Sequence, residues 1–310
     1  MNAKSEGFTW VKEGIHLPQG AWARTERHML HWQGRPILGL TAGEPRPSLF
    51  PVYSPAGHLV TAEAPADHPH HRSIWIAADH VNLLMPIDGG GHEIYAYNFY
   101  VDEIFQGRAP ARIVQTSLEG SAHDADSFVI LQNLQWVGPR EWGAPDGRAL
   151  LREERRWTVY PGERHHVIDV SSVLRTTQWA VEIGPTRHAY FNARVSEPMR
   201  VLSGGRLIGA GGLEGAEAIS GSQARWVDAS GPVGREWAGV ALGPRTLPRT
   251  PWWFVSDWGV LTLNAFRTQP LLLPVGGSAR LEARYVVHDG PADPGLLDRL
   301  FDPGQDSACT

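Results

Sequence analysis

Residues 151–177 read LREERRWTVYPGERHHVIDVSSVLRTT, and this stretch decides the class of fold. Its two arms, residues 155–160 and 165–174, are rich in strand-forming residues, and PGER between them is a turn signal. The sequence therefore predicts a β-hairpin here. Other short or alternating apolar runs, bounded by Gly, Pro, Asn or Asp, recur along the chain and predict further strands. This pattern is typical of an all-β protein.

Helical periodicity is scarce in the rest of the sequence. The best helix candidate is PADPGLLDRLFDPG, residues 291–304, where Asp293 can cap a helix and Pro294 occupies its first position. The 34 Gly and 24 Pro follow no period and mark no linker. We therefore expect a single domain over residues 1–310, built as a large antiparallel β-sandwich with a short C-terminal helix.

The composition excludes several classes of protein. Hydrophobic residues make up 42% of the chain and charged residues 20%, as in a packed globular protein. The net charge of -5, with intermixed signs, provides no basic stripe for nucleic acid. No run of about 18 apolar residues and no signal-peptide core occur, so we expect no membrane partner. The single Cys309 fits a reducing compartment, and we expect the protein to be cytoplasmic.

The 13 Trp are more than a core usually needs. Aromatic faces often act as stacking platforms in sugar-binding clefts, although most of these rings can equally be core residues.

The densest chemical segment is DHPHHRSIWIAADHVN, residues 67–82, which holds four imidazoles, two carboxylates and a guanidinium. These groups can provide acid–base catalysis, hydrogen bonds to hydroxyls or nitrogen ligands for a metal. In an extended segment, His68 and His70 would point to one side and His71 to the other. The structural alternatives are a buried His68 and a plain ion pair between Arg72 and Asp67. The segment provides three catalytic candidates, His70, His71 and His80, and three substrate-binding candidates, Arg72, Trp75 and Asn82.

A divalent metal is the alternative use of these histidines. If a loop folds back, His70, His80, His92 and Glu93 could provide the converging ligands that a metal needs. The HExxH and cupin-type spacings are absent, however, which favours hydrogen-bonding roles for these side chains.

A second candidate segment is TRHAYFN, residues 186–192. If it alternates as a strand, His188 and Tyr190 share one face. His188 could then protonate a sugar oxygen and Tyr190 could position the ring. The alternative is that His188 is a satisfied core residue.

A third candidate region combines RWVDASG, residues 225–231, with the Trp- and Pro-rich residues 244–266. The pattern suggests a rigid loop over a pocket, or a surface loop that covers a sheet edge. The substrate-binding candidates here are Asp228, Arg249, Trp253 and Asp257.

Three strings resemble the PmoA-like family of uncharacterised bacterial proteins, often labelled "methane oxygenase PmoA". They are ADHPHHRSIWIAADHVN (residues 66–82), ARWVDASG (224–231) and GPRTLPRTPWWFVSDWGVLTLNAF (243–266), and the resemblance extends over residues 35–290. An oxygenase subunit of that name would be embedded in a membrane, and this chain has no spanning segment. The label therefore does not describe the chemistry we expect.

The chain also resembles galactose mutarotase and its relatives, a β-supersandwich family that acts on sugars. TRHAYFN is similar to that family's TNHxYFN motif, whose histidine is a general acid, and this implies the same role for His188. The sequence LLLPVGGSARLEARYVV, residues 271–287, is similar to the last strand of the family. Asn264 stands where the resemblance places the glutamate base, and an amide cannot accept a proton at neutral pH. The base would then be His70, His71, His80 or Asp257.

The function we expect is that of a carbohydrate-active enzyme, an isomerase, lyase or hydrolase acting on a sugar or oxidised sugar by histidine acid–base chemistry. It would require no cofactor, and its partner would be a small carbohydrate; the sequence leaves a homo-oligomer open. One alternative is a metal-dependent enzyme or oxygenase that uses the histidine cluster. Another is a non-catalytic glycan-binding module.

Overall fold

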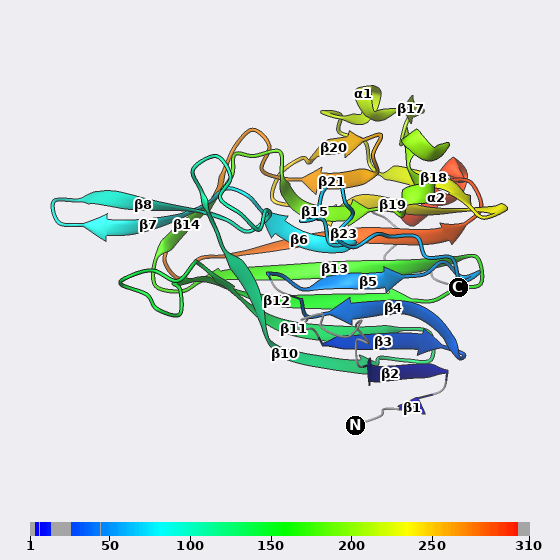
Figure 1. Cartoon of the computed structure of the whole chain (residues 1–310), viewed down its shortest axis with the longest axis horizontal. Coiled ribbons are helices and arrows are strands. Elements are labelled where there is room, and N and C mark those ends of the chain that lie inside the picture. Colours follow the sequence, from blue (N-terminus) through cyan, green and yellow to red (C-terminus); the bar gives the residue numbers. More distant parts are fainter. Residues whose placement is uncertain (1–3, 6, 14–25, 44, 303–310) are drawn as a thin grey trace.

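Strands dominate the structure, a computed structural model that describes residues 4–5, 7–13, 26–43 and 45–302 (Figure 1). They form two nine-stranded sheets and one five-stranded sheet. Among the described strands, β8 pairs in parallel with β9, and the pairings that build the large sheets are antiparallel. The prediction of an all-β antiparallel fold is confirmed. The predicted thiol, Cys309, lies outside the described residues.

The first sheet carries the two histidine-bearing motifs. In spatial order it consists of β1 (Lys4–Ser5), β2 (Phe8–Glu13), β3 (Arg27–Trp32), β4 (Arg35–Thr41), β5 (Ser48–Val52), β6 (Ile74–Ala78), β15 (Ala189–Arg194), β21 (Val260–Asn264) and β20 (Trp252–Ser256).

The second sheet contains the hairpin that the sequence predicts, β12 and β13, which pair from Leu151 with Thr176 to Tyr160 with Val167. In spatial order it consists of β10 (Arg112–Ala122), β11 (Phe128–Val137), β12 (Ala149–Tyr160), β13 (His165–Thr176), β23 (Ser278–Asp289), β19 (Glu236–Thr246), β18 (Val227–Val233), β16 (Arg206–Gly209) and β17 (Leu213–Glu214).

The third sheet extends to one side of the molecule, where Figure 1 shows β7 and β8 projecting beyond the large sheets. It consists of β22 (Leu271–Leu273), β14 (Ala180–Ile183), β7 (Val81–Ile87), β8 (Gly91–Asn98) and β9 (Ala109–Pro110).

Helices are short in the described residues. They are α1 (Ala216–Ile219), α2 (Pro294–Leu300) and two 3-10 turns, Glu197–Met199 and Val201–Ser203. The helix α2 confirms the predicted C-terminal helix, because Oδ1 of Asp293 accepts a hydrogen bond from the Leu296 N–H at 3.1 Å and Pro294 occupies the first position. None of the described helices is long and apolar enough to cross a membrane.

The two large sheets share one hydrophobic core. Ring centroids of Phe8 on β2 and Phe128 on β11 are 5.6 Å apart, and those of Tyr190 on β15 and Trp136 on β11 are 6.2 Å apart. Both contacts join a strand of the first sheet to a strand of the second. The sheets are therefore packed as the two layers of a sandwich, with side chains from both inner faces between them.

A buried ion pair lies inside this sandwich. The alternation of β12 turns Glu153 and Arg155 inward, where Arg155 donates to both carboxylate oxygens at 2.7 and 2.8 Å. Trp136 Nε1 and the Ser172 hydroxyl also donate to Glu153, each at 2.7 Å. The hydroxyls of Ser172 and Tyr190 are 2.8 Å apart, so the polar network reaches the first sheet. A carboxylate enclosed in this way depends on its arginine for charge balance.

This network generates a stability prediction with a matched control one residue away. Arg155→Met leaves the buried Glu153 without a cation, and we expect it to lower the free energy of unfolding by about 3–5 kcal/mol. Arg156→Met changes the exposed neighbour and should stay within about 0.5 kcal/mol of the parent. Urea unfolding followed by tryptophan fluorescence measures both values. Equal midpoints for the two variants would show that the ion pair does not stabilise the fold.

Candidate functional site

The antiparallel pairing of β6 with β15 brings two sequence motifs together. Ala78, the last residue of β6, lies opposite Ala189, the first residue of β15. Asp79 therefore follows one strand at the point where His188 precedes the other, and the Asp79 N–H donates to the His188 carbonyl at 3.2 Å. Residues that are 109 positions apart in the sequence are thus adjacent in space.

Asp79 is the centre of a group that we call the Asp79 group, comprising Asp79, His80, Thr186 and His188. The carboxylate of Asp79 is buried, with 1% of the residue exposed. Nδ1 of His80 donates to its Oδ1 at 2.8 Å, and Nδ1 of His188 donates to its Oδ2 at 3.0 Å. The Thr186 hydroxyl donates to Oδ1 as well. One carboxylate therefore orients two imidazole rings.

The two imidazoles are partly accessible, unlike the carboxylate that holds them. The side chains of His80 and His188 are 29% and 19% exposed. Because Nδ1 of each ring is bound to Asp79, Nε2 is the nitrogen left for other interactions. Nε2 of His188 accepts a hydrogen bond from Nε of Arg187 at 3.1 Å. This arrangement fixes the orientation and the tautomer of both rings.

Hydrogen bonds keep Asp79 ionised. Burial alone would raise the pKa of Asp79, but the hydrogen bonds from His188, His80 and Thr186 hold that pKa well below its ordinary value. The Asp79 carboxylate is therefore a fixed negative charge beside two imidazole rings. Such a charge stabilises an imidazolium when one forms.

Asn264 supports the Asp79 group and is not itself a proton acceptor. Its Nδ2 donates to the Thr186 carbonyl at 2.6 Å, and its Oδ1 accepts from the Phe266 N–H at 2.6 Å. The Thr186 hydroxyl in turn accepts from the His188 N–H at 3.0 Å. The amide at this position therefore anchors the turn that precedes His188.

The histidine turn, which we define as residues 66–72, has a conformation that the sequence analysis did not predict. The His68 N–H donates to the Pro65 carbonyl and the His71 N–H to the His68 carbonyl, each at 3.0 Å, so the segment forms turns and not an extended strand. The expectation of an extended segment, with His68 and His70 on one side and His71 on the other, is therefore wrong. The rings of His68 and His71 stack at 4.9 Å, and His70 contacts the edge of His71 at 4.6 Å.

Tryptophans enclose the histidine turn. Trp258 lies in the turn between β20 and β21 and stacks on His68, with ring centroids 4.0 Å apart, while Trp75 stacks on His71 at 5.0 Å. Arg194 at the end of β15 holds Asp67 through Nη2 at 2.7 and 2.8 Å. The predicted ion pair of Asp67 with Arg72 is thus replaced by one with Arg194, and Arg72 instead pairs with Asp102 at 3.2 Å.

Burial keeps two histidines of the turn neutral at pH 7. Burial, followed by the charge of Arg46, lowers the pKa of His70 to about 4. Burial, followed by the neighbouring His70 and His68, lowers the pKa of His71 still further. Neutral rings of this kind serve as packing and hydrogen-bonding groups. The side chains of His80 and His188, by contrast, are oriented by Asp79 and partly accessible.

Tyr100 connects the histidine turn with the Asp79 group. Its ring centroid lies 5.8 Å from His70, 5.7 Å from Trp75 and 5.4 Å from His188. Phe254 contacts the edge of His188 at 6.0 Å. Trp75 and Tyr100 belong to a small cluster that is separate from the main core. The two histidine motifs therefore meet on the face of the first sheet that points away from the sandwich interior.

Several predicted binding residues lie elsewhere in the fold. Tyr190 is fully buried, and its hydroxyl bonds that of Ser172. The alternation predicted for residues 186–192 does not include His188, because β15 begins at Ala189 and His188 precedes the strand. Trp253 is buried and donates to the Ala224 carbonyl at 2.8 Å. Asp228 is buried in the second sheet, where it accepts from Nε2 of His288 at 2.8 Å. Each of these three side chains is buried and bonded to a neighbour within the protein.

The remaining predicted binding residues are more accessible. Asn82 on β7 donates to Glu182 of β14 at 3.0 Å. Arg249 is exposed and donates to the Pro270 carbonyl at 2.8 Å, and Asp257 is exposed in the turn that carries Trp258. Of the binding residues that the sequence suggested, Arg72 belongs to the histidine turn and Trp75 stacks on it.

The predicted metal ligands are not brought together. His92 and Glu93 are exposed on β8, opposite Pro86 and Met85 of the projecting hairpin, whereas His70 and His80 lie at the first sheet. β7 leads the chain away from His80, so the loop does not fold back. In the described part of the chain, no three His, Cys, Asp or Glu side chains are grouped as metal ligands.

Sequence analysis missed Tyr100, Arg194, Arg46 and Asp102. Arg194 could have been predicted, because a charged residue directly after the largely apolar residues YFNA (190–193) requires a buried partner. The other three come from loops whose sequences hold no recognisable motif. Only the fold places Asp102 beside both Arg46 and Arg72.

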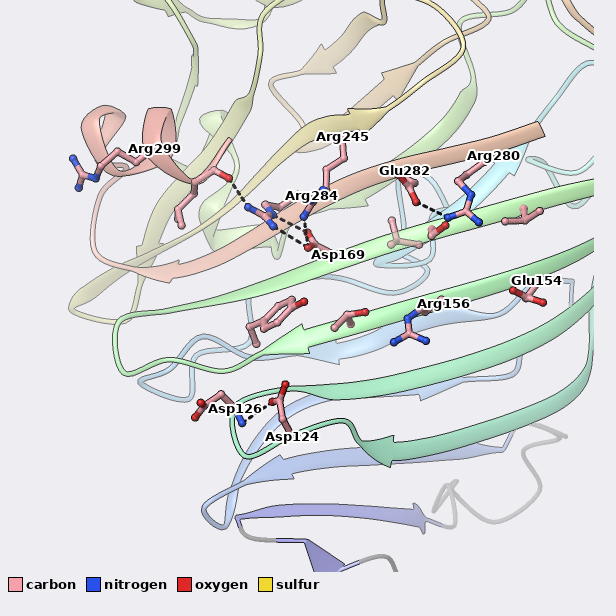
Figure 2. A pocket seen from close by; sticks show the side chains of 16 residues that line it. Asp124, Asp126, Glu154, Arg156, Asp169, Arg245, Arg280, Glu282, Arg284 and Arg299 are labelled. Carbon is pink, nitrogen blue, oxygen red and sulfur yellow. Dashed lines mark hydrogen bonds and ion pairs between the residues drawn. The ribbon is translucent and has the colours of Figure 1, made fainter. Parts of the chain in front are cut away.

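A separate cavity of about 600 Å³ lies on the outer face of the second sheet (Figure 2). It is lined mainly by outward-facing side chains of β12, β13 and β23, and Arg245 of the third candidate region also lines it. Figure 2 shows ion pairs of Asp169 with Arg245 and Arg284, and of Glu282 with Arg280. These ion pairs involve five of the ten charged residues that line the cavity. The imidazoles paired on Asp79 lie apart from this cavity, because neither His80 nor His188 lines it.

Comparison with known proteins identifies a family and a shared fold. A protein-family model described as a family of unknown function, DUF6807, matches residues 28–302. No curated protein matches the sequence significantly. The "putative aldose 1-epimerase" of Klebsiella pneumoniae subsp. pneumoniae aligns with a TM-score of 0.51 at 12% identity, over 99% of this chain and 92% of that one. This similarity shows the mutarotase-like fold.

Two further structures align less closely. An alpha-galactosidase from Lactobacillus brevis gives a TM-score of 0.45 at 7% identity, over 89% of this chain and 41% of that one. A galactose mutarotase related enzyme from Lactobacillus acidophilus gives a TM-score of 0.38 at 10% identity, over 83% of this chain and 96% of that one. The PmoA-like name suggested by the sequence is not confirmed by these comparisons.

The neutral state of His70 generates a pH prediction. Its ring binds a proton less readily in the folded protein than in the unfolded chain, so its contribution to stability is complete above pH 6.5 and is lost as the pH falls toward about 4. Between these pH values His70→Gln should therefore lose less unfolding free energy than the parent does. The two slopes should differ by less than roughly 1.4 kcal/mol per pH unit, because the ring is partly exposed.

Urea unfolding at several pH values between about 4 and 6.5 measures this slope. The exposed His123→Gln provides the control, because its side chain lies on a turn far from the buried histidines in the sequence. If both variants keep the parent slope, His70 is not a source of the pH dependence.

Proposed function

The chain belongs to the DUF6807 family, a family of unknown function, and we propose that it is an enzyme that acts on a sugar or an oxidised sugar by histidine acid–base chemistry. The proton-transfer groups are His188 and His80, and Asp79 is the residue that positions them. The reaction lies in the range of isomerases, lyases and hydrolases, all of which move protons at oxygen or carbon.

The observation that carries this proposal is the pair of imidazoles on one buried carboxylate. Asp79 binds Nδ1 of both rings, so each ring offers Nε2 to a substrate in a fixed tautomer. One imidazole can donate a proton to a sugar oxygen while the other removes one, and the carboxylate stabilises whichever ring becomes charged. His80 thus takes the role of the glutamate base that the mutarotase resemblance places at Asn264.

The surroundings of His188 suit a sugar ring. Tyr100 and Phe254 place aromatic rings 5.4 and 6.0 Å from it. Aromatic faces pack against the C–H faces of sugars, while neutral His70 can exchange hydrogen bonds with a hydroxyl. The shared fold with the Klebsiella pneumoniae protein supports a carbohydrate by analogy.

Variants of the Asp79 group test the proposal. His188→Gln and His80→Gln should each lower kcat by about 100- to 10,000-fold, because each removes one proton-transfer group. Asp79→Asn should lower kcat as well, since an amide can hold only one imidazole in the required tautomer. His123→Gln is the control. Activity can be followed by NMR in D₂O on a panel of aldoses, 3-oxo-sugars, uronates and disaccharides, where proton abstraction appears as deuterium incorporation.

The outcomes separate the proposal from the binding-module alternative. Turnover that depends on both His188 and His80 supports acid–base catalysis. If a sugar is turned over equally well by the parent and by both histidine variants, the Asp79 group is not the catalytic centre. Binding without turnover, unchanged in His188→Gln, would identify a non-catalytic glycan-binding protein and overturn the proposal.

A further inference from the structure

Positively charged side chains surround the candidate site in excess. Arg46 and Arg72 both pair with Asp102, and Arg194 pairs with Asp67. Asp102 is therefore shared between two guanidinium groups. Burial raises the pKa of the nearby Glu63, while the charge of Arg72 opposes that shift.

The carboxylate of Asp79 does not balance the remaining arginines. It already accepts hydrogen bonds from His80, His188 and Thr186, and Nη2 of Arg108 lies 3.9 Å from its Oδ2. Four of the five guanidinium groups around the two histidine motifs thus pair with only three carboxylates, Asp67, Asp79 and Asp102, and the fifth arginine is Arg187.

Arg187 is the arginine best placed to meet a ligand. Its side chain is exposed, and the described residues offer it no carboxylate within ion-pair distance. Nε donates to the neutral Nε2 of His188 at 3.1 Å, and the guanidinium lies 5.3 Å from the ring centroid of Phe254. It therefore stands beside the nitrogen that the proposed function assigns to proton transfer.

Hydrogen-bond donors are in excess as well as charge. Within the described residues, ten buried side-chain polar atoms have no hydrogen-bond partner, and five of them are donors at this site. They are Nε of Arg46, Arg72, Arg108 and Arg194, and Nε1 of Trp75. A region with unused donors and excess positive charge favours a ligand that provides acceptors and negative charge.

We propose that the substrate is a sugar that carries a carboxylate or phosphate group, and that Arg187 binds this group. The inference rests on the proposed function and names the substrate class of the same site. A guanidinium forms stronger hydrogen bonds to an anionic oxygen than to a neutral imidazole. Binding of the anion draws Arg187 away from His188, which frees Nε2 of His188 for the substrate. Arg187 is thus a specificity-determining residue that couples recognition of charge to proton transfer.

Matched pairs of charged and neutral sugars test this proposal by calorimetric titration. The pairs are D-glucuronate with D-glucose and D-galacturonate with D-galactose, with D-glucose 6-phosphate as the phosphate arm. We expect a charged sugar to bind at least about tenfold more tightly than its neutral partner, with affinity falling as salt is added. Arg187→Gln should remove this preference, and the exposed Arg152→Gln on β12 should keep it.

Arg187→Lys distinguishes the two anions. A lysine keeps the positive charge of Arg187 but lacks the planar guanidinium. Relative to Arg187→Gln, Arg187→Lys should therefore recover binding of a phosphate better than binding of a carboxylate. Equal affinity for charged and neutral sugars, no binding of any charged sugar, or equal affinities in Arg187→Gln and Arg152→Gln would each overturn the inference.

The result is also separable from the proposed function. If charged sugars bind through Arg187 but neither the parent nor His188→Gln turns them over, the inference holds and the catalytic proposal fails. If neutral sugars are turned over through His188 without any preference for charge, the catalytic proposal holds and the inference fails.

Discussion

The pairing of β6 with β15 is the constraint on which the candidate site depends. The register that sets Ala78 opposite Ala189 determines that Asp79 and His188 leave their strands side by side. It also determines that Ile76 and Phe191 face the core while Trp75 faces outward. A slip of one residue would exchange the two faces, so the core of the sandwich and the geometry of the site are specified by the same register.

The protein uses buried carboxylates in two different ways. Glu153 lies in the core and is matched by Arg155, whose charge does not change at physiological pH, so the pair is a permanent part of the packing. Asp79 is equally buried but is matched by two imidazoles and a hydroxyl. Imidazoles can gain and lose protons near pH 7, and this makes the second arrangement suited to chemistry.

The fold was more predictable from sequence than the site was. The β12–β13 hairpin and the cap of α2 depend on neighbouring residues, so local patterns were sufficient to find them. His80 and His188 were candidates from the sequence because each lies in a distinctive motif, and their role stays a prediction. That Asp79 binds both of them could not be found, since it depends on strands more than 100 residues apart. Strand alternation did not predict the turns of residues 66–72, because their conformation depends on stacking against Trp258 and on the ion pair of Asp67 with Arg194.

The neutral histidines and the surplus arginines are two aspects of one electrostatic arrangement. Arg46 and Arg194 are among the charges that oppose protonation of His71, and Arg46 acts on His70 as well. A cluster of histidines would usually compete with arginines for an anion by becoming charged. Here the arginines and burial prevent this, so the positive charge remains on groups that cannot transfer a proton. On the two proposals made above, recognition of charge and transfer of protons therefore belong to different side chains, which meet where Arg187 contacts His188.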